Sequence, residues 1–366
     1  MKKHRNQLLL YILAAFLTIK FTSAVDFLFN GFDSSDVSVY GNATIESRIL
    51  TLTKDSGFAI GRALYASRIP TKHPNSSLLL PFSTSFIFSM APYEGRLPGH
   101  GLVFLFAPFE GIQGTNSAQH LGLLNFTNNG NSSNHVFGVE FDCFRNQEFN
   151  DINDNHVGID VNSLISVSAY EAGYWPDDHR KKEDGSPDEN SFKSLLLNNG
   201  RTYQVWIDYA DSLVNVTMAP VGMKRPNQPL LSVSLNLSQV LEDEMYVGFT
   251  ASTGDMIQSH KILAWSFSNT NFSLSEGLIT GGLPSFELPS TPIHRTKVRH
   301  RRIRKLREEI EDWELEYWPH RITYQEIELA TKSFADENVI GIGGNGKVYK
   351  GVLPGGSEVA VKAHFS

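Results

Sequence analysis

The sequence predicts an all-β protein built on an antiparallel β-sandwich. Residues 25–275 consist of many short runs rich in β-branched and aromatic residues, separated by Gly, Asn, Pro or Asp. No convincing amphipathic helix interrupts these runs. The 24 Phe and 12 Tyr of the chain also suit a β-rich core. Closely spaced strands without helices indicate two packed sheets.

The expected strands can be located along this region. They are SLLLPFSTSFIFSM, GHGLVFLFAPF, HVFGVEFDCF, HVGIDVNSLISVSAY, RTYQVWIDYA, LVNVTMAPV and EMYVGFTAS. With 366 residues, the chain has room for one large β domain and a smaller unit. Its net charge of −7 gives no reason to expect nucleic acid as a partner.

Residues 1–24 have the pattern of a signal peptide. Three basic residues precede the apolar run from Leu8 to Leu17, and small residues lead to a cleavage site after Ala24. The apolar run is too short to span a bilayer. The alternative interpretation is a buried N-terminal helix.

Seven N-glycosylation sequons also favour export through the secretory pathway. They begin at Asn42, Asn75, Asn125, Asn131, Asn215, Asn236 and Asn271. Cys143 is the only cysteine, so the chain cannot form an internal disulfide. Its stability therefore has to come from the size of the core or from bound metal.

The stretch from Val139 to Asp160 concentrates side chains that can bind metal. The candidate ligands are Glu140, Asp142, Phe144, Asn146, Asp151 and His156. The first three are spaced by two, so on one strand they would share a face. Oxygen ligands favour calcium, whereas an imidazole beside carboxylates suits manganese or another transition ion. The alternative is a polar surface loop, in which the carboxylates would repel one another.

The spacing Glu-x-Asp-x-aromatic-x-Asn-x4-Asp-x4-His resembles the metal loop of the legume, or L-type, lectins, which have a concanavalin-like jelly-roll sandwich. Further segments extend the resemblance over nearly all of residues 25–275: AVDFLFNGF, GHGLVFLFAP, QHLGLLN, VGFTASTGDM and ILAWSFS. The resemblance implies a transition-ion site formed by Glu140, Asp142, Asp151 and His156. It implies a calcium site formed by Asp142, the Phe144 carbonyl, Asn146 and Asp151. Cys143 alternates to the opposite face and is not expected to be a ligand.

The same resemblance implies a carbohydrate site beside the metal loop. Asn146 would donate from its amide to a sugar hydroxyl, the Phe144 ring would stack on the sugar, and Asp255 lies in a further sugar loop. His100 takes the position of the family's binding Asp, and Gln119 replaces a frequent Gly. A neutral imidazole accepts fewer hydrogen bonds than a carboxylate, so we expect altered or weakened affinity for simple sugars. The alternative is that His100 is a loop residue that contacts no ligand.

Three segments follow the predicted sandwich. Residues 276–294 form a linker rich in Gly, Pro and Ser, and residues 295–322 are first basic and then acidic. The charged segment is interpreted either as a solvated helix or as a juxtamembrane segment near anionic lipid. Residues 323–366 begin with a capping box formed by Thr323 and Glu326, which predicts a short helix.

A glycine-rich motif near the end resembles the start of a protein kinase. Its residues are Gly341, Gly343, Gly346 and Val348, with Lys362 following in the sequence Ala-Val-Lys. In kinases such glycines bring backbone amides to the ATP phosphates, and the lysine reaches the α- and β-phosphates. Together with the preceding EDWELEYWPHRITYQEIELATKSF, the motif resembles the plant L-type lectin-domain receptor kinases.

Two departures from that family shape the functional prediction. The sequence contains no His-Arg-Asp catalytic loop, no Asp-Phe-Gly motif and no helix carrying the partner Glu. It also has no apolar stretch of membrane-spanning length between the lectin-like region and the basic run. We therefore interpret the kinase region as a vestigial N-lobe fragment, for which ATP use is not expected. A truncated or mispredicted gene product accounts for both departures.

The leading hypothesis is a carbohydrate-binding, Ca/Mn-dependent L-type lectin ectodomain without catalysis, located in the extracellular space or apoplast. Its partners would be glycans or cell-wall carbohydrate. One alternative is a serine/threonine receptor kinase that binds ATP at the plasma membrane, if the chain is a fragment. Another is a non-catalytic protein-interaction decoy, which forms homodimers or pairs with full-length lectin receptors through sandwich edges.

Overall fold

A computed structural model describes residues 24–74, 76–93, 99–177, 191–270, 278, 280–286, 327–328, 330–343, 346–352 and 358–364. Residues 1–23 of the predicted signal peptide, the whole charged segment and the capping box at Thr323 lie outside these ranges. In the part of the chain that is described, no helix has the length and hydropathy needed to cross a membrane.

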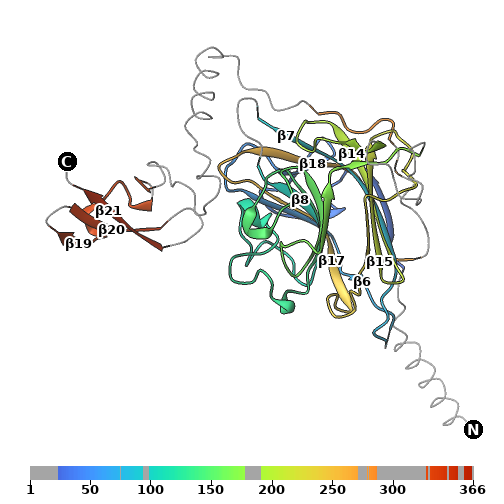
Figure 1. The fold of residues 1–366 in the computed structure, drawn as a ribbon, viewed down its shortest axis with the longest axis horizontal. Helices are drawn as coiled ribbons and strands as arrows, with labels where there is room; N and C mark the ends of the chain where they lie inside the picture. The colour runs from blue at the N-terminus through green and yellow to red at the C-terminus, as the bar shows by residue number, and fades with distance from the viewer. Residues whose placement is uncertain are drawn as a thin grey trace, which may run out of the picture.

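Two antiparallel sheets of eight strands each face one another (Figure 1). We call the first the back sheet. In spatial order it contains β16 (Leu231–Ser234), β15 (Leu213–Pro220), β14 (Thr202–Ala210), β7 (Phe82–Pro92), β18 (Gln258–Ser268), β4 (Ile49–Thr53) and β3 (Thr44–Glu46), and β1 (Asp26–Asn30) also pairs with β18.

We call the second the front sheet. In spatial order it contains β11 (Ser168–Glu171), β10 (His156–Val161), β9 (Phe137–Asp142), β8 (Gly101–Ala107), β17 (Glu244–Ser252), β5 (Ile60–Tyr65) and β2 (Val37–Gly41), and β6 (Ile69–Pro70) also pairs with β17. A separate two-stranded ladder joins β12 (Gly173–Tyr174) to β13 (Lys193–Ser194).

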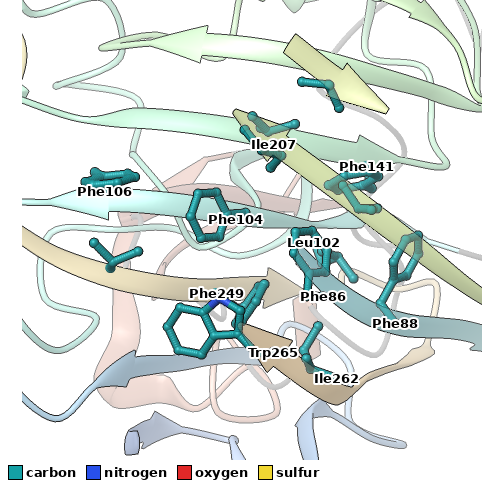
Figure 2. Close-up of a cluster of buried hydrophobic side chains, with 14 of the residues drawn as sticks. Phe86, Phe88, Leu102, Phe104, Phe106, Phe141, Ile207, Phe249, Ile262 and Trp265 are labelled. Atoms are coloured by element: carbon teal, nitrogen blue, oxygen red, sulfur yellow. The ribbon is translucent and has the colours of Figure 1, made fainter. Parts of the chain in front are cut away.

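Aromatic side chains fill the space between the two sheets. Phe86 on the back sheet meets Phe249 on the front sheet edge-on, with ring centroids 4.9 Å apart. Trp265 of β18 contacts the same Phe249 ring at 5.0 Å. Figure 2 shows these side chains together with Phe104 and Phe141 in one cluster between the strands. Such pairs stabilise the sandwich beyond the apolar area that they bury.

The predicted sandwich is confirmed, with differences in detail. The strand expected from Ser77 begins only at Phe82, directly after Pro81, which has no N–H to donate to a ladder. The segment beginning at His156 divides into β10 and β11. The four strands β2 to β5 were not among the expected strands, because each is only three to six residues long and offers little alternation.

A third, three-stranded antiparallel sheet is formed by β19 (Val339–Gly343), β20 (Gly346–Val352) and β21 (Glu358–His364). Strands β19 and β20 form a hairpin in which Gly343 pairs with Gly346. On β21, Lys362 lies opposite Val348. This arrangement places the glycine motif and the lysine on one small sheet, but the assignment to a kinase lobe stays a prediction.

Candidate functional site

The pairing of β9 with β10 brings the metal-loop side chains together. In this antiparallel ladder His156 lies opposite Asp142, and Gly158 lies opposite Glu140. Ligand atoms of Glu140, Asp142 and His156 all lie within 4.8 Å of one another, and the three side chains are buried. Because β9 ends at Asp142, the expectation that Phe144 shares this strand is wrong.

The imidazole of His156 is oriented by a backbone contact. Its Nδ1 lies 2.9 Å from the carbonyl oxygen of Asn153. A carbonyl can only accept a hydrogen bond, so Nδ1 must carry the proton and Nε2 faces the carboxylates. Nε2 lies 3.2 Å from Glu140 Oε1 and 4.0 Å from Asp151 Oδ1. The sequence between β9 and β10 therefore folds back and adds a third carboxylate to the cluster.

Two backbone hydrogen bonds hold the loop after β9. The Phe144 N–H donates to Asp142 Oδ1 at 2.7 Å, and the Asn146 N–H donates to Asp151 Oδ2 at 2.6 Å. Each carboxylate thus orders the backbone of a neighbouring residue while its other oxygen remains available. The short 3-10 helix η3 (Gln147–Phe149) follows directly after Asn146.

The buried carboxylates of this cluster repel one another unless protons or a cation neutralise them. Burial, followed by the nearby Glu140 charge, raises the pKa of Asp142. Burial also raises the pKa of Asp151, to about 7. Burial alone lowers the pKa of His156, but the hydrogen bond to Glu140 and the surrounding carboxylates raise it more, to about 9. Without a cation, the cluster has to hold protons to limit carboxylate repulsion.

Two further observations show that the residues fit metal ions. Asn146 is 3% exposed, and its Oδ1 is buried without a hydrogen-bond partner. An unpaired buried amide oxygen is costly and is a common calcium ligand. At Gly158, a Cβ would lie 2.5 Å from Glu140 Oε1 and 2.1 Å from Ser166 Oγ. Glycine therefore leaves the space in which the Glu140 carboxylate sits.

Sequence reasoning missed Asp160, which is linked to Glu140 of the cluster through Ser166. It lies on β10 two residues after Gly158 and is fully buried. Ser166 Oγ lies 2.7 Å from Glu140 Oε1 and 2.8 Å from Asp160 Oδ1. Since one hydroxyl has only one proton to donate, a second proton is needed to satisfy both acids. Burial and the Glu140 charge raise the pKa of Asp160, which favours protonation of this carboxyl. The alternation from His156 through Gly158 to Asp160 was the available signal.

Three loops converge on His100 beside this cluster. Its ring centroid lies 5.1 Å from that of Phe144, and its carbonyl accepts a hydrogen bond from the Cys143 N–H at 3.0 Å. A Cβ on Gly254 would come within 2.7 Å of His100 Nε2. His100 is only 5% exposed, and its Nδ1 has no hydrogen-bond partner. Burial, with a smaller contribution from His120, lowers its pKa to about 3, so the imidazole is neutral at ordinary pH.

The two other residues predicted to bind carbohydrate, Gln119 and Asp255, differ from each other in burial. Gln119 is buried in the 3-10 helix η1 (Ala118–His120), whereas Asp255 is exposed. His120, which follows Gln119 in the chain, was missed by sequence reasoning. It is buried, its Nδ1 is unpaired, and its ring centroid lies 4.3 Å from that of Phe126. Nothing in the spacing of the sequence distinguishes it from a core residue.

A buried polar network lies on the opposite side of the backbone at Cys143. Gln258 Nε2 lies 3.2 Å from Cys143 Sγ and 3.0 Å from His260 Nε2. His260 Nδ1 lies 2.6 Å from Thr53 Oγ1. Cys143 therefore points toward this network, and burial raises the pKa of its thiol.

The predicted glycosylation sites differ in exposure. Asn42, Asn131 and Asn236 are exposed, and Asn125 and Asn215 are partly buried. Asn75 and Asn271 lie outside the described residues.

Comparison with known proteins gives a family match over nearly the same residues as the predicted sandwich. Residues 24–278 match the legume lectin domain. The chain is 60% identical to the L-type lectin-domain containing receptor kinase VII.1 of Arabidopsis thaliana, over 97% of this chain and 54% of that protein. It is 49% identical to the probable L-type lectin-domain containing receptor kinase VII.2 of the same plant, with the same coverage. The chain thus spans about half the length of these curated relatives.

Solved lectin structures resemble the sandwich. Lectin II from Ulex europaeus is 27% identical, with a TM-score of 0.54 over 67% of this chain and 97% of that chain. Peanut lectin with a 9mer peptide gives 27% identity and a TM-score of 0.55 over the same shares. A lectin UEA-II structure in complex with galactose is 27% identical, with a TM-score of 0.53 over 67% of this chain and 98% of that chain.

Proposed function

The chain belongs to the legume lectin domain family, and from this premise we propose that residues 25–275 bind carbohydrate at the loops around His100, Phe144 and Asn146. The observation that carries the proposal is the convergence of these loops beside a buried acidic cluster. Phe144 lies against His100, and Asn146 is fixed by Asp151. An aromatic ring, an amide and an imidazole are then available to one small polar ligand.

We propose that Glu140, Asp142, Asp151 and His156 hold a transition ion such as Mn²⁺. Asp142, the Phe144 carbonyl, Asn146 and Asp151 would hold Ca²⁺. Bound cations would neutralise the buried carboxylates and provide a partner for Asn146 Oδ1. With Oδ1 engaged, the Asn146 amide directs its N–H donors toward a sugar hydroxyl.

We propose that His100 changes the specificity of this site. Its imidazole is neutral and has one acceptor, whereas a carboxylate at this position would accept several charge-assisted hydrogen bonds. Such a bond contributes about 1.5–3 kcal/mol, so affinity for simple monosaccharides is expected to be about tenfold weaker or more. Extended glycans that gain contacts elsewhere on the loops are the better candidates.

A glycan array probed with the secreted chain tests this function. Binding that requires Ca²⁺, that is lost in EDTA and that is lost in Asn146→Ala would support it. The matched control is Asn227→Ala, which changes an exposed asparagine outside both the site and the sequons and should bind as the parent does. Binding to no glycan under any condition would instead favour a protein-interaction module.

The proposed setting is the extracellular side of the secretory pathway, where cell-wall glycans are available. The predicted signal peptide and the sequons motivate this proposal, and the similarity to receptor kinases allows a site at the plasma membrane within a longer protein. Pairing with a second copy or with full-length lectin receptors is a further proposal. Microscopy of the chain with a C-terminal fluorescent tag would distinguish secretion from retention at the membrane.

A second candidate function concerns the three-stranded sheet. Gly341, Gly343 and Gly346 lie around the hairpin of β19 and β20, and Lys362 lies on the adjacent strand. We propose that in a longer chain this sheet holds ATP phosphates, as in the kinase relatives, and that these residues alone do not catalyse transfer. Labelling of Lys362 by a lysine-reactive ATP analogue, compared with Lys350 on the same sheet, would test it.

A further inference from the structure

A groove of about 680 Å³ opens on the outer face of the back sheet. Its floor consists of Gln204 and Trp206 from β14 and of Asn215 and Thr217 from β15. Its walls are formed by residues of the turn from Gly222 to Pro229, together with Leu278 and Thr280. None of these residues belongs to the proposed carbohydrate loops, so the groove is a separate feature.

Asn215 projects into this groove because of strand alternation. Its neighbours Val214 and Val216 point inward and are buried in the core between the sheets. Asn215 therefore faces outward, between Asp208 on β14 and Ser232 on β16. Its side chain is partly exposed and makes no hydrogen bond within the described residues. Asn215 and Thr217 are also the first and third residues of a glycosylation sequon.

Fixed aromatic and charged groups line the groove. Arg225 forms an ion pair with Asp208, and its guanidinium carbon lies 6.0 Å from the Trp206 ring. Gln204 is held by a hydrogen bond from its Nε2 to Ser85 Oγ at 3.1 Å. Trp206 and Gln204 are only 3% and 4% exposed and form a rigid base, so the groups open to a sugar ring are the Asn215 amide and the turn with Met223 and Arg225.

We propose that Asn215 carries an N-linked glycan whose first sugar residues lie in this groove. During glycosylation the Asn215 Nδ2 bonds to C1 of N-acetylglucosamine as the C1–O bond to a lipid-linked diphosphate breaks. The diphosphate leaves, and Nδ2 gives up one proton. A cleft of this volume suits a ligand of drug size, which corresponds to one or two sugar rings. The glycan would lie against the turn that contains Arg225, above the Trp206 side chain, which is only 3% exposed.

The position of Asn215 distinguishes it from the other sequons. Asn42 and Asn131 are exposed in turns, and neither lines this groove. Glycans at those positions would project into solvent and would be open to enzymes. A glycan at Asn215 would leave its linkage amide within the cleft, where the walls restrict access. Glycosylation of Asn215 and docking of its glycan do not require lectin activity.

The test is site-resolved removal of glycans from the natively folded chain, secreted from plant cells. A peptide N-glycosidase that accepts plant glycans is added, and occupancy at Asn215 and Asn42 is followed by glycopeptide mass spectrometry. We expect Asn215 to be occupied and to be released at least tenfold more slowly than Asn42. After denaturation the two rates should become equal. Absence of a glycan at Asn215, or equal native rates, would overturn the proposal.

A variant separates docking in the groove from general stability. Trp206→Leu removes the aromatic part of the floor and should accelerate release at Asn215 while leaving release at Asn42 unchanged. General unfolding would accelerate both sites, so the ratio of the two rates is the readout. Should Trp206→Leu not be secreted, Met223→Ser on the exposed turn provides a milder change with the same expected direction. An unchanged ratio in the secreted variant would show that the glycan does not contact the groove.

Discussion

Asp151 fixes Asn146 while it also faces His156. Asp151 Oδ2 accepts the Asn146 N–H at 2.6 Å, and Oδ1 lies 4.0 Å from His156 Nε2. One carboxylate thus connects the predicted metal cluster to the residue proposed to contact sugar. Any change that moves Asp151 is expected to alter both metal binding and carbohydrate binding.

Removal of metal is therefore expected to destabilise the sandwich. Ligands that bind only the folded state stabilise it by about 2.7 kcal/mol at a hundredfold excess over Kd. For a domain of this size, loss of that amount lowers Tm by roughly 5–10 °C. Differential scanning fluorimetry with Ca²⁺ and Mn²⁺, and again after EDTA, would measure the shift. Identical melting temperatures would count strongly against the proposed ions.

Ser166→Ala tests the support behind the metal cluster. The variant removes the hydroxyl that lies within hydrogen-bond distance of both Glu140 and Asp160. Loss of such a supporting contact is expected to weaken binding of the transition ion by about 10–100-fold. Isothermal titration calorimetry with Mn²⁺ would measure the affinity. The matched control is Ser163→Ala, since Ser163 lies in the same loop but bonds only to the backbone of Ile165. Equal Mn²⁺ affinities in the two variants would contradict the role of Ser166.

His100→Asp tests whether the imidazole limits sugar binding. The carboxylate would restore several charge-assisted acceptors beside Phe144, so we expect about a tenfold gain in affinity for simple monosaccharides when Ca²⁺ is present. Isothermal titration calorimetry with galactose would measure the gain in affinity. His100→Asn has a similar size without the charge and should show little improvement. If His100→Asp folds, binds Ca²⁺ and gains nothing, His100 does not control the site.

The fold was largely predictable from the sequence, because alternation places Val205 and Ile207 of β14 inward while Gln204 and Trp206 face outward. Many of the candidate ligands were also predictable from the sequence. Glu140 and His156 are close in the chain and lie on two strands that pair with each other. Contacts between distant segments were not predictable.

His120 illustrates such a contact. It is buried by Phe126 and Phe149, and only the folded loops bring it near His100. Asp160 could have been found from its alternation with His156 on β10, whereas the contact that Ser166 makes with it depends on the loop after that strand. The Asn215 groove likewise requires the turn containing Arg225 to fold over β14, and strand alternation carries no information about that turn.

Acid sensitivity is expected from the buried histidines His100, His120 and His260. Burial lowers their pKa values to about 3, 4 and 3, whereas an unfolded histidine has a pKa near 6.5. Between these values the unfolded chain binds protons at these three histidines that the folded chain does not, so their contribution to stability falls as pH falls below about 6.5. From pH 7.5 to 5.5 each histidine should cost about 1.4 kcal/mol of unfolding free energy.

His260→Gln is expected to reduce this pH dependence by about 1.4 kcal/mol, because glutamine takes up no proton on unfolding. Glutamine retains polar atoms that can face Thr53 and Gln258, the present partners of the imidazole. Urea denaturation at pH 7.5 and 5.5, with divalent cations held constant, gives the difference in unfolding free energy for each protein. The matched control is His73→Gln, which removes an exposed histidine and should leave that difference as it is in the parent. An equal pH dependence in the parent and His260→Gln would mean that His260 takes up protons in the folded state, contrary to its burial.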